Sequence, residues 1–389
     1  MGLVYQIKKM PQATSELDAA ITDFTMATGA NEAQIKSLMK AYGELGDELR
    51  ATITDVTVSA TEWLKQGQSL VDTETLVSNT MVLSKIGSLS SADATKYLTS
   101  AMKGYKVAVE DTLDVVDKLS AVDMASATDV GGLAEAMSGV AASAELAGVS
   151  MDKLLGYAAV IGEVTQQGMS ETGTTLNAVF ARMGNIKLAR LKDYQNSEGV
   201  DLSNVETVLR GIGINLRDSS NSFRDFDEVL DETASRWNNF SEVQQRAVAQ
   251  AFAGTHHLNE FIILMENYDT ALKYAGISAE SSGEAMQKFA AYEESIAGHT
   301  ERLRNEFILL SSDLASSDLI KSFIDLGTIG VKGIHGLVEE FGLLGNIGLF
   351  SGLITGVKNV GRDKMSSLKR ICRQQYSSYT KYKFRYCAL

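Results

Sequence analysis

Proline is almost absent from this sequence. The chain of 389 residues contains a single proline, Pro11, whereas an average protein of this length has roughly twenty. Because proline interrupts helices and is common in turns between strands, its near absence favours long, uninterrupted helices. Aromatic residues make up only 7% of the chain, and the good helix formers alanine, leucine and methionine are plentiful. We therefore predict an all-α fold.

Motifs of the common catalytic and nucleotide-binding classes are also missing. The chain contains neither a P-loop nor a G-x-S-x-G nucleophile elbow. Gly211 and Gly213 lie in "LRGIGINLRD", which lacks the third glycine of a dinucleotide-binding fingerprint. The two cysteines, Cys372 and Cys387, are too few for a disulfide framework or a structural zinc site. We therefore predict no enzyme activity, no catalytic residues and no cofactor.

Histidine occurs only four times, and two of the four are adjacent in "AFAGTHHLNEFIILM". His256 and Glu260 are four residues apart, so on a helix they would share a face and offer two metal ligands. A zinc site needs at least a third protein ligand, and His299 and His335 are isolated in the sequence. His257 falls in an apolar stripe that is typical of a partly buried helix face. We therefore predict no metal site.

The net charge of −13 is unevenly distributed. Residues 361–389 contain eight Lys or Arg and one acid, whereas the 360 residues before them contain 28 basic and 48 acidic groups. Such an acidic body does not bind nucleic acid, because phosphate binding requires clustered Lys and Arg. The basic tail, residues 359–389, is either an RNA- or membrane-binding segment or a disordered or frame-shifted sequence that no fold selected. The abrupt change in charge favours the second interpretation.

Residues 1–275 read as a bundle of many helices. Asn31 and Gln34 form a capping-box pattern at the start of an apolar helical repeat, and Ser241 and Gln244 form another. Gly, Ser, Asp and Asn separate segments of about 12–20 residues. No alternating pattern is long enough to build a sheet.

After residue 275 the pattern changes. Apolar side chains follow at seven-residue intervals, with a partial second row at Phe307 and Leu314; the first row is Phe289, Ile296, Leu303 and Leu310. This spacing predicts a long amphipathic helix over residues 276–318. The helix is either one strand of a coiled coil or a helix that lies on the preceding bundle, and the pattern does not decide between them.

Residues 319–358 are predicted to form an apolar, glycine-rich helical segment. The stretch "FGLLGNIGLFSGLITGV", residues 341–357, contains no charge over 17 residues, which is the lower limit for crossing a bilayer. Glycines recur along one helical stripe, at Gly342, Gly345, Gly348, Gly352 and Gly356. Such a stripe permits close helix packing. The segment is therefore either buried against other helices, the interpretation we favour, or active on a membrane.

Two stretches of the chain carry short motifs in a fixed order. In residues 128–183 a small-residue helix ends in a short turn, and a later Gly-Thr-x-Leu segment leads into a further helix; the motif positions are Ala147, Gly148, Val149, Ser150, Gly173, Thr174 and Leu176. In residues 208–272 an Ala-Gly-Thr turn precedes an Asn-x-Phe helix start, at Gly254, Thr255, Asn259 and Phe261. Together these motifs resemble the core region of bacteriophage and prophage tail tape measure proteins. The resemblance covers roughly residues 20–358, and residues 128–272 are its most specific part.

The paired histidines occupy variable positions of this family pattern. The resemblance implies that Gly254 ends one helix and that Thr255 caps the next. His256 and His257 occupy the two variable positions that follow Thr255 and are not a catalytic pair.

The resemblance also implies a function. A tape measure protein lies in the lumen of the virion tail tube, sets tail length while tube subunits polymerise around it, and later assists genome delivery. The implied partners are the tail tube protein, tail assembly chaperones, baseplate or tail-tip proteins, further copies of the chain and, during delivery, the host membrane. The resemblance also implies synthesis in the host bacterial cytoplasm, from a phage or a prophage genome. Family members are usually much longer, so this chain looks like the front part of a tape measure.

Two other classes of function stay open at the level of sequence. One is a membrane-active, pore-forming helical protein in which Phe341–Val357 inserts. This class would be favoured if the purified protein made liposomes leak and the substitution Gly348→Asp abolished the leakage. The other is a cytosolic helical adaptor, which would be monomeric and would not associate with tube subunits or tail chaperones.

Overall fold

The computed structural model describes residues 2–188, 206, 209–218 and 224–315. The chain divides into two compact units, Met1–Ser312 and Asp313–Leu389, and the description below concerns the first. The predicted glycine-rich segment with its five-glycine stripe and the predicted basic tail lie outside the described residues.

The described residues form helices and no strands, which confirms the predicted all-α fold. The helices are α1 (Gly2–Thr28), α2 (Glu32–Glu48), α3 (Ile53–Lys65), α4 (Leu70–Ile86), α5 (Ser91–Tyr105), α6 (Thr112–Ala125), α7 (Val130–Ser138), α8 (Ala141–Ala147), α9 (Met151–Thr165), α10 (Met169–Leu188), α12 (Phe226–Arg236), the 3-10 helix η1 (Trp237–Asn239), α13 (Glu242–Ala253), α14 (Leu258–Glu266), α15 (Tyr268–Ala279), α16 (Glu284–Glu293) and α17 (Ile296–Ala315).

Side chains just before the helices fix where many of them begin. Asn31 accepts a hydrogen bond from the Gln34 backbone N–H, and the Gln34 side chain accepts one from the Asn31 N–H. Ser241 and Gln244 form the same reciprocal pair at the start of α13. Both predicted capping boxes are therefore confirmed. They satisfy backbone donors that a helix N-terminus otherwise leaves unpaired.

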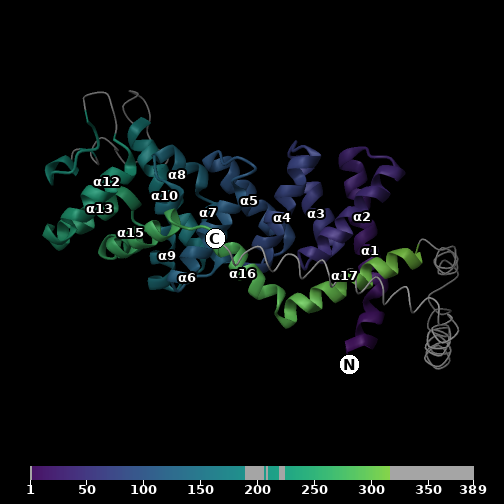
Figure 1. Ribbon diagram of the computed structural model, residues 1–389. Helices are drawn as coiled ribbons and strands as arrows, with labels where there is room; N and C mark the ends of the chain where they lie inside the picture. The colour runs from purple at the N-terminus through teal and green to yellow at the C-terminus, as the bar shows by residue number, and fades with distance from the viewer. Residues whose placement is uncertain (1, 189–205, 207–208, 219–223, 316–389) are drawn as a thin grey trace, which may run out of the picture. The chain divides into compact units, whose positions relative to one another are not determined.

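Consecutive and distant helices pack closely against one another. The closest pairs include α1 with α3, α7 with α10, and α9 with α15 (Figure 1). Helix α15 also contacts α6. Glycine makes the α9–α15 contact that close. A Cβ atom on Gly156 would lie 2.2 Å from the carbonyl oxygen of Ala271. The backbones of α9 and α15 thus touch where a side chain would otherwise separate them.

The core between α3, α4, α5 and α6 is apolar but contains polar pairs. Trp63 is 1% exposed, and its Nε1–H donates to Thr80 Oγ1 at 3.1 Å. Asn79 Nδ2 donates to Thr112 Oγ1 at 2.8 Å, and the hydroxyls of another buried pair, Ser59 and Thr95, lie 3.0 Å apart. Every one of these pairs joins two different helices. Because the groups are hydrogen-bonded, their burial is tolerated.

The expected single helix over residues 276–318 is instead divided. The end of α15, then α16 and then α17 occupy its described part. The break between α16 and α17 lies at Ser295, whose Oγ accepts a hydrogen bond from the Gly298 N–H at 3.1 Å. A Cβ atom on Gly298 would lie 2.5 Å from the carbonyl oxygen of Tyr292, so glycine permits the tight turn.

The seven-residue row therefore does not lie on one face. Phe289 is buried on α16, where it contributes to the core, whereas Ile296 and Leu303 on α17 are 87% and 53% exposed. The change of direction at Ser295 separates them. Coiled-coil pairing of the outward part of the row stays a prediction.

Candidate functional site

The first family motif forms the turn between α8 and α9. Gly148 has φ +85°, a left-handed conformation that favours glycine. Ser150 then caps α9 by accepting a hydrogen bond from the Lys153 N–H at 3.2 Å. Ala147 and Val149 are buried. The motif is therefore a helix end followed directly by a helix start.

This turn also contacts the start of α12. A Cβ atom on Gly148 would lie 2.8 Å from Oδ1 of Asp225, the residue before α12. Glycine is thus favoured here both by its conformation and by the proximity of a distant residue. Phe226, which follows Asp225, is fully buried.

The second motif lies on α10 and packs against α7. A Cβ atom on Gly173 would lie 2.6 Å from the carbonyl oxygen of Ala136, so the two helix backbones are in contact. Leu176 is 1% exposed, whereas Thr174 faces outward and its hydroxyl donates to the Ser170 carbonyl within the helix. Gly173 and Leu176 serve packing.

The third motif separates α13 from α14. Gly254 has φ +73° and ends α13, as predicted. The prediction that Thr255 caps α14 is wrong, because the helix begins two residues later and His257 occupies the cap position, without a side-chain cap. Thr255 is exposed, as is Asn259 in the first turn of α14. The turn after Gly254 is longer than the local pattern implies.

The paired histidines have different surroundings. His257 is partly buried, and its Nδ1 lies 3.0 Å from Oγ1 of Thr175 on α10, next to the second motif. His256 is exposed. Within the described part of the chain, no group of three or more His, Cys, Asp or Glu side chains is arranged to hold a metal ion. The His257–Thr175 contact instead joins the second and third motifs.

Five buried aromatic side chains contact one another in a row, called the aromatic cluster here: Phe180, Phe226, Trp237, Phe252 and Phe261. The ring centroids of Phe226 and Phe252 are 5.4 Å apart, and so are those of Phe252 and Phe261. Trp237 and Phe180 contact the ends of this row. Offset aromatic contacts at these distances stabilise a core beyond simple burial. Phe261, a predicted motif residue, therefore serves packing.

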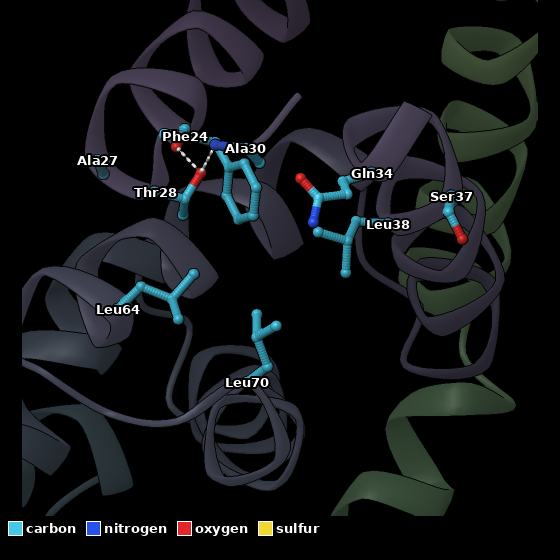
Figure 2. A pocket seen from close by; sticks show the side chains of 10 residues that line it. Phe24, Ala27, Thr28, Ala30, Gln34, Ser37, Leu38, Leu64 and Leu70 are labelled. Carbon is cyan, nitrogen blue, oxygen red and sulfur yellow. Dashed lines mark hydrogen bonds between the residues drawn. The ribbon is translucent and has the colours of Figure 1, made fainter. Parts of the chain in front are cut away.

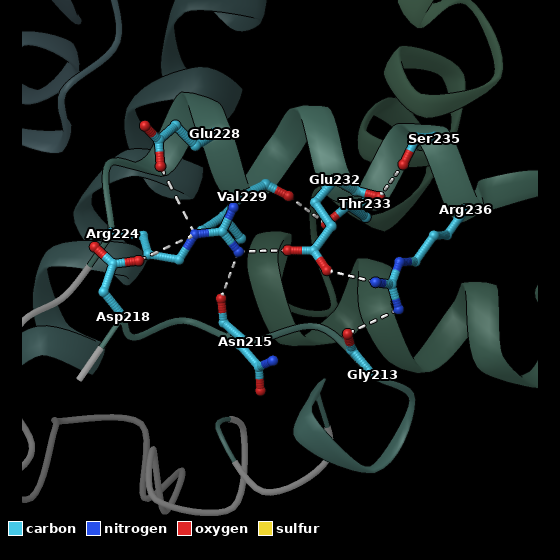
Figure 3. Close-up of polar contacts among 10 residues, drawn as sticks. All are labelled: Gly213, Asn215, Asp218, Arg224, Glu228, Val229, Glu232, Thr233, Ser235 and Arg236. Atoms are coloured by element: carbon cyan, nitrogen blue, oxygen red, sulfur yellow. Dashed lines mark hydrogen bonds and ion pairs between the residues drawn. The ribbon is translucent and has the colours of Figure 1, made fainter. Parts of the chain in front are cut away.

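Arg224 organises a second feature, an ion-pair network that joins α12 to the chain before it (Figure 3). Its guanidinium pairs with Glu232, lies 3.7 Å from Glu228, and donates to the carbonyl of Asn215 at 3.0 Å. The hydrogen bond with Glu232 raises the pKa of Arg224.

Glu232 has a second cationic partner, Arg236, at 2.8 Å. Arg236 in turn donates to the carbonyl of Gly213 at 2.9 Å. The four-residue spacing of Arg224, Glu228, Glu232 and Arg236 is the signal that would have revealed the network.

A partly buried network joins α9, α12 and α15. The hydroxyls of Tyr157 and Tyr268 are 2.8 Å apart, and Tyr268 donates to Asp231 at 2.8 Å. Lys153 donates to Asp231 and Asp227 at 2.8 and 3.2 Å. Burial raises the pKa of Tyr268, and its neighbours Tyr157 and Asp231 raise it further. The network therefore links three helices through hydrogen bonds and ion pairs.

An apolar groove opens between the first four helices, called the α1–α4 groove here. Its volume is about 660 Å³. Figure 2 shows Phe24, Leu38, Leu64 and Leu70 around it. No charged side chain lines it. Leu70 is 57% exposed, so the groove is open to solvent at this side chain.

These features define a helical scaffold in which the motif glycines and the buried motif residues serve turns and packing. Comparison with protein families agrees with this description. The family of phage-related minor tail proteins matches residues 39–254, which is more than half of the chain, and the chain belongs to this family. The match begins within α2 and ends at the Gly254 turn, so it includes the first two motifs and all but the last member of the aromatic cluster. A comparison with solved structures found no match.

Family membership identifies a component of the phage tail and indicates a structural rather than a catalytic protein. Among the helices that the structure describes, none has both the length and the apolar character needed to cross a bilayer. The uncharged stretch 341–357 lies outside these helices.

Proposed function

We propose that this minor tail protein is a tape measure protein, which lies in the lumen of the tail tube and sets the length to which the tube grows. The observation that carries the proposal is the use of the family motifs. Gly148, Gly173 and Phe261 all serve turns and packing around one core. These motif residues determine how the helices pack, which supports a structural role for the chain.

The composition of the chain supports this proposed role. One proline in 389 residues allows long continuous helix, and α-helix converts residue number into length at about 1.5 Å per residue. The excess of acidic groups before residue 361 disfavours binding to nucleic acid. Such a surface suits a protein that occupies a tube through which DNA later passes.

The proposed partners follow from the same role. They are the tail tube protein around the chain, tail assembly chaperones that shelter its apolar segments, and baseplate or tail-tip proteins at its end. Further copies of the chain would pair through the outward side chains Ile296 and Leu303. The host membrane would meet the uncharged residues 341–357 during genome delivery.

Deletion and duplication in the phage gene test the ruler. Both changes are placed at residues 319–340, beyond the compact unit that ends at Ser312, so that the described bundle is left intact. If these residues count toward length as helix, their removal shortens the mean tail by about 33 Å, and their duplication lengthens it by the same amount. Tail length is measured on many virions by electron cryomicroscopy.

A folding defect gives a different result. Gly156→Ala, which disturbs the bundle without changing chain length, is expected to reduce the number of tails while leaving the length of those that form unchanged. Tails of wild-type length from both the deletion and the duplication would overturn a ruler role for residues 319–340.

A further inference from the structure

The attachment of α17 to the rest of the bundle depends on one buried polar side chain. Asn305 is fully buried and lies at the corner between α2 and α3. Its Oδ1 accepts a hydrogen bond from the Ile53 N–H at 2.7 Å. Its Nδ2 donates to the carbonyl of Gly43 at 3.1 Å and to Oδ1 of Asp47 at 2.8 Å. One side chain thus links residues that are about 250 positions away in the chain.

Two glycines of α2 make room for this attachment. A Cβ atom on Gly43 would lie 3.0 Å from a methyl group of Leu309, and one on Gly46 would lie 3.1 Å from Nδ2 of Asn305. We call the surface made by Gly43, Gly46 and the Ile53 N–H the α17 seat. It is complementary to the face of α17 that carries Asn305 and Leu309.

The seat does not need α17 in order to form. The capping box of Thr52 and Asp55 fixes the start of α3, and α3 packs closely on α1, α2, α4 and α5. The Ile53 N–H is one of the donors that a helix N-terminus leaves free, so water can replace Asn305 there.

The attachment of α17 is narrow in comparison with that of α16. Beyond Asn305, its described apolar contacts with the core come from Ile308, which is buried, and Leu309, which is partly buried. Within the described residues, α17 is not among the helices whose backbones pack closely on another helix. Its outward side chains Ile296 and Leu303 are exposed.

α16 is held more firmly. Asp117, which is 5% exposed, accepts hydrogen bonds from the Gly283 and Ala285 N–H groups at 2.9 and 2.8 Å. Lys288 forms an ion pair with Asp123, and the Phe289 side chain is buried. The turn at Ser295 therefore joins α16, which Asp117 and Lys288 hold, to α17, whose described attachment centres on Asn305.

We propose that α17 is a releasable arm: Asn305 latches it into the α17 seat, the chain bends at Ser295, and the arm leaves while the other helices stay folded. Local opening of this kind is expected where few apolar contacts hold an element. Release exposes Ile308 and Leu309 in addition to the outward row, so the free arm presents apolar side chains on both sides. This behaviour belongs to the isolated chain and does not depend on the ruler function.

Hydrogen–deuterium exchange of the full-length chain, read by mass spectrometry in native buffer, tests the arm. Amides of residues 299–309 are expected to exchange at least about tenfold faster than those of α9, because the arm opens without global unfolding. Asn305→Asp replaces the donor to Asp47 by a carboxylate and should accelerate exchange in the arm by a further factor of about ten, with no change in α9. Thr300→Ala, at an exposed position of the same helix, is the matched control and should leave exchange as in the wild type.

A second change separates a latch from general damage. In the double variant Asn305→Asp with Asp47→Asn, the new amide can donate to the new carboxylate, and exchange of the arm should return toward the wild-type rate, although the donor to the Gly43 carbonyl is still missing. A disulfide between Gly43→Cys and Leu309→Cys, in a chain with Cys372 and Cys387 changed to Ser, should suppress exchange of the arm when oxidised and release it when reduced. Exchange of the arm at the rate of α9 in the wild type would overturn the proposal. So would equal acceleration of α9 and the arm by Asn305→Asp.

Discussion

The close contact between α9 and α15 predicts that adding one methyl group, in Gly156→Ala, lowers the stability of the chain. In Gly156→Ala the new Cβ would lie 2.2 Å from the carbonyl oxygen of Ala271 and 3.1 Å from the backbone nitrogen of Ala275. These are backbone atoms, so no side-chain rotation relieves the clash, and the two helices must move apart. Overpacking of this kind destabilises by about 1–3 kcal/mol, occasionally more. An alanine within a helix gains about 1 kcal/mol over glycine.

Gly276 on α15 supplies the matched control, since a Cβ atom there would have no heavy atom within 4 Å beyond its own helix and chain neighbours. Gly276→Ala therefore keeps only the favourable contribution and should raise the free energy of unfolding by about 0.5–1 kcal/mol. Gly156→Ala should lower it by about 1–2 kcal/mol, because its clash lies at the severe end of the range. Urea unfolding followed by far-UV circular dichroism measures both.

The sign of the difference is what matters in this comparison. If Gly156→Ala were as stable as Gly276→Ala, the two backbones would not be in contact, and the packing of α9 against α15 would be refuted. Exchange of amides in α9 and α15 gives a local check, because only Gly156→Ala should accelerate it.

Three further outcomes are expected. Gly148→Ala should destabilise the chain by about 1–2 kcal/mol, since alanine is strained at φ +85°, whereas Gly139→Ala, at φ −80° with no close neighbour, should leave the urea midpoint unchanged or raise it. Asp117→Asn weakens the two hydrogen bonds that start α16 and should lower the free energy of unfolding by about 1–2 kcal/mol. Asp114 is exposed on α6, the helix that also carries Asp117, and Asp114→Asn should change this free energy by only about a few tenths of a kcal/mol. Equal effects of the two substitutions would contradict the buried cap. Burial raises the pKa of Tyr42 from 10.0 to about 12. As the pH rises from 10 to 12, this tyrosine loses its proton in the unfolded chain before it does so in the folded chain, so the free energy of unfolding falls. Tyr42→Phe should reduce that fall by on the order of 2 kcal/mol, as measured by urea midpoints across this pH range.

Local signals in the sequence predicted the helices well. The pairs Asn31 with Gln34 and Ser241 with Gln244 start helices as expected, because a capping box involves only residues three positions apart. The glycine at 254 ends α13 for the same kind of local reason. The exception, Thr255, shows the limit: which residue begins α14 depends on the contact of His257 with α10.

Contacts between distant residues could not be predicted in this way. A single Asn305 or Asp117 within a polar helical stretch gives no sign that it will be buried, because its partners lie more than 160 positions away. Helix periodicity tells which residues share a face but not which other helix meets that face. The break at Ser295 was missed because the seven-residue row continues across it.

The polar pairs inside the core have a consequence for how the helices find their alignment. Apolar burial is non-directional, so by itself it discriminates weakly between helix alignments that differ by one turn. Such a slip would leave the indole N–H of Trp63 without its acceptor on Thr80, and the amide of Asn79 without Thr112. Each stranded group disfavours the shifted arrangement by about 1–3 kcal/mol. The polar pairs therefore favour one alignment of these helices over the alignments that are shifted by a turn.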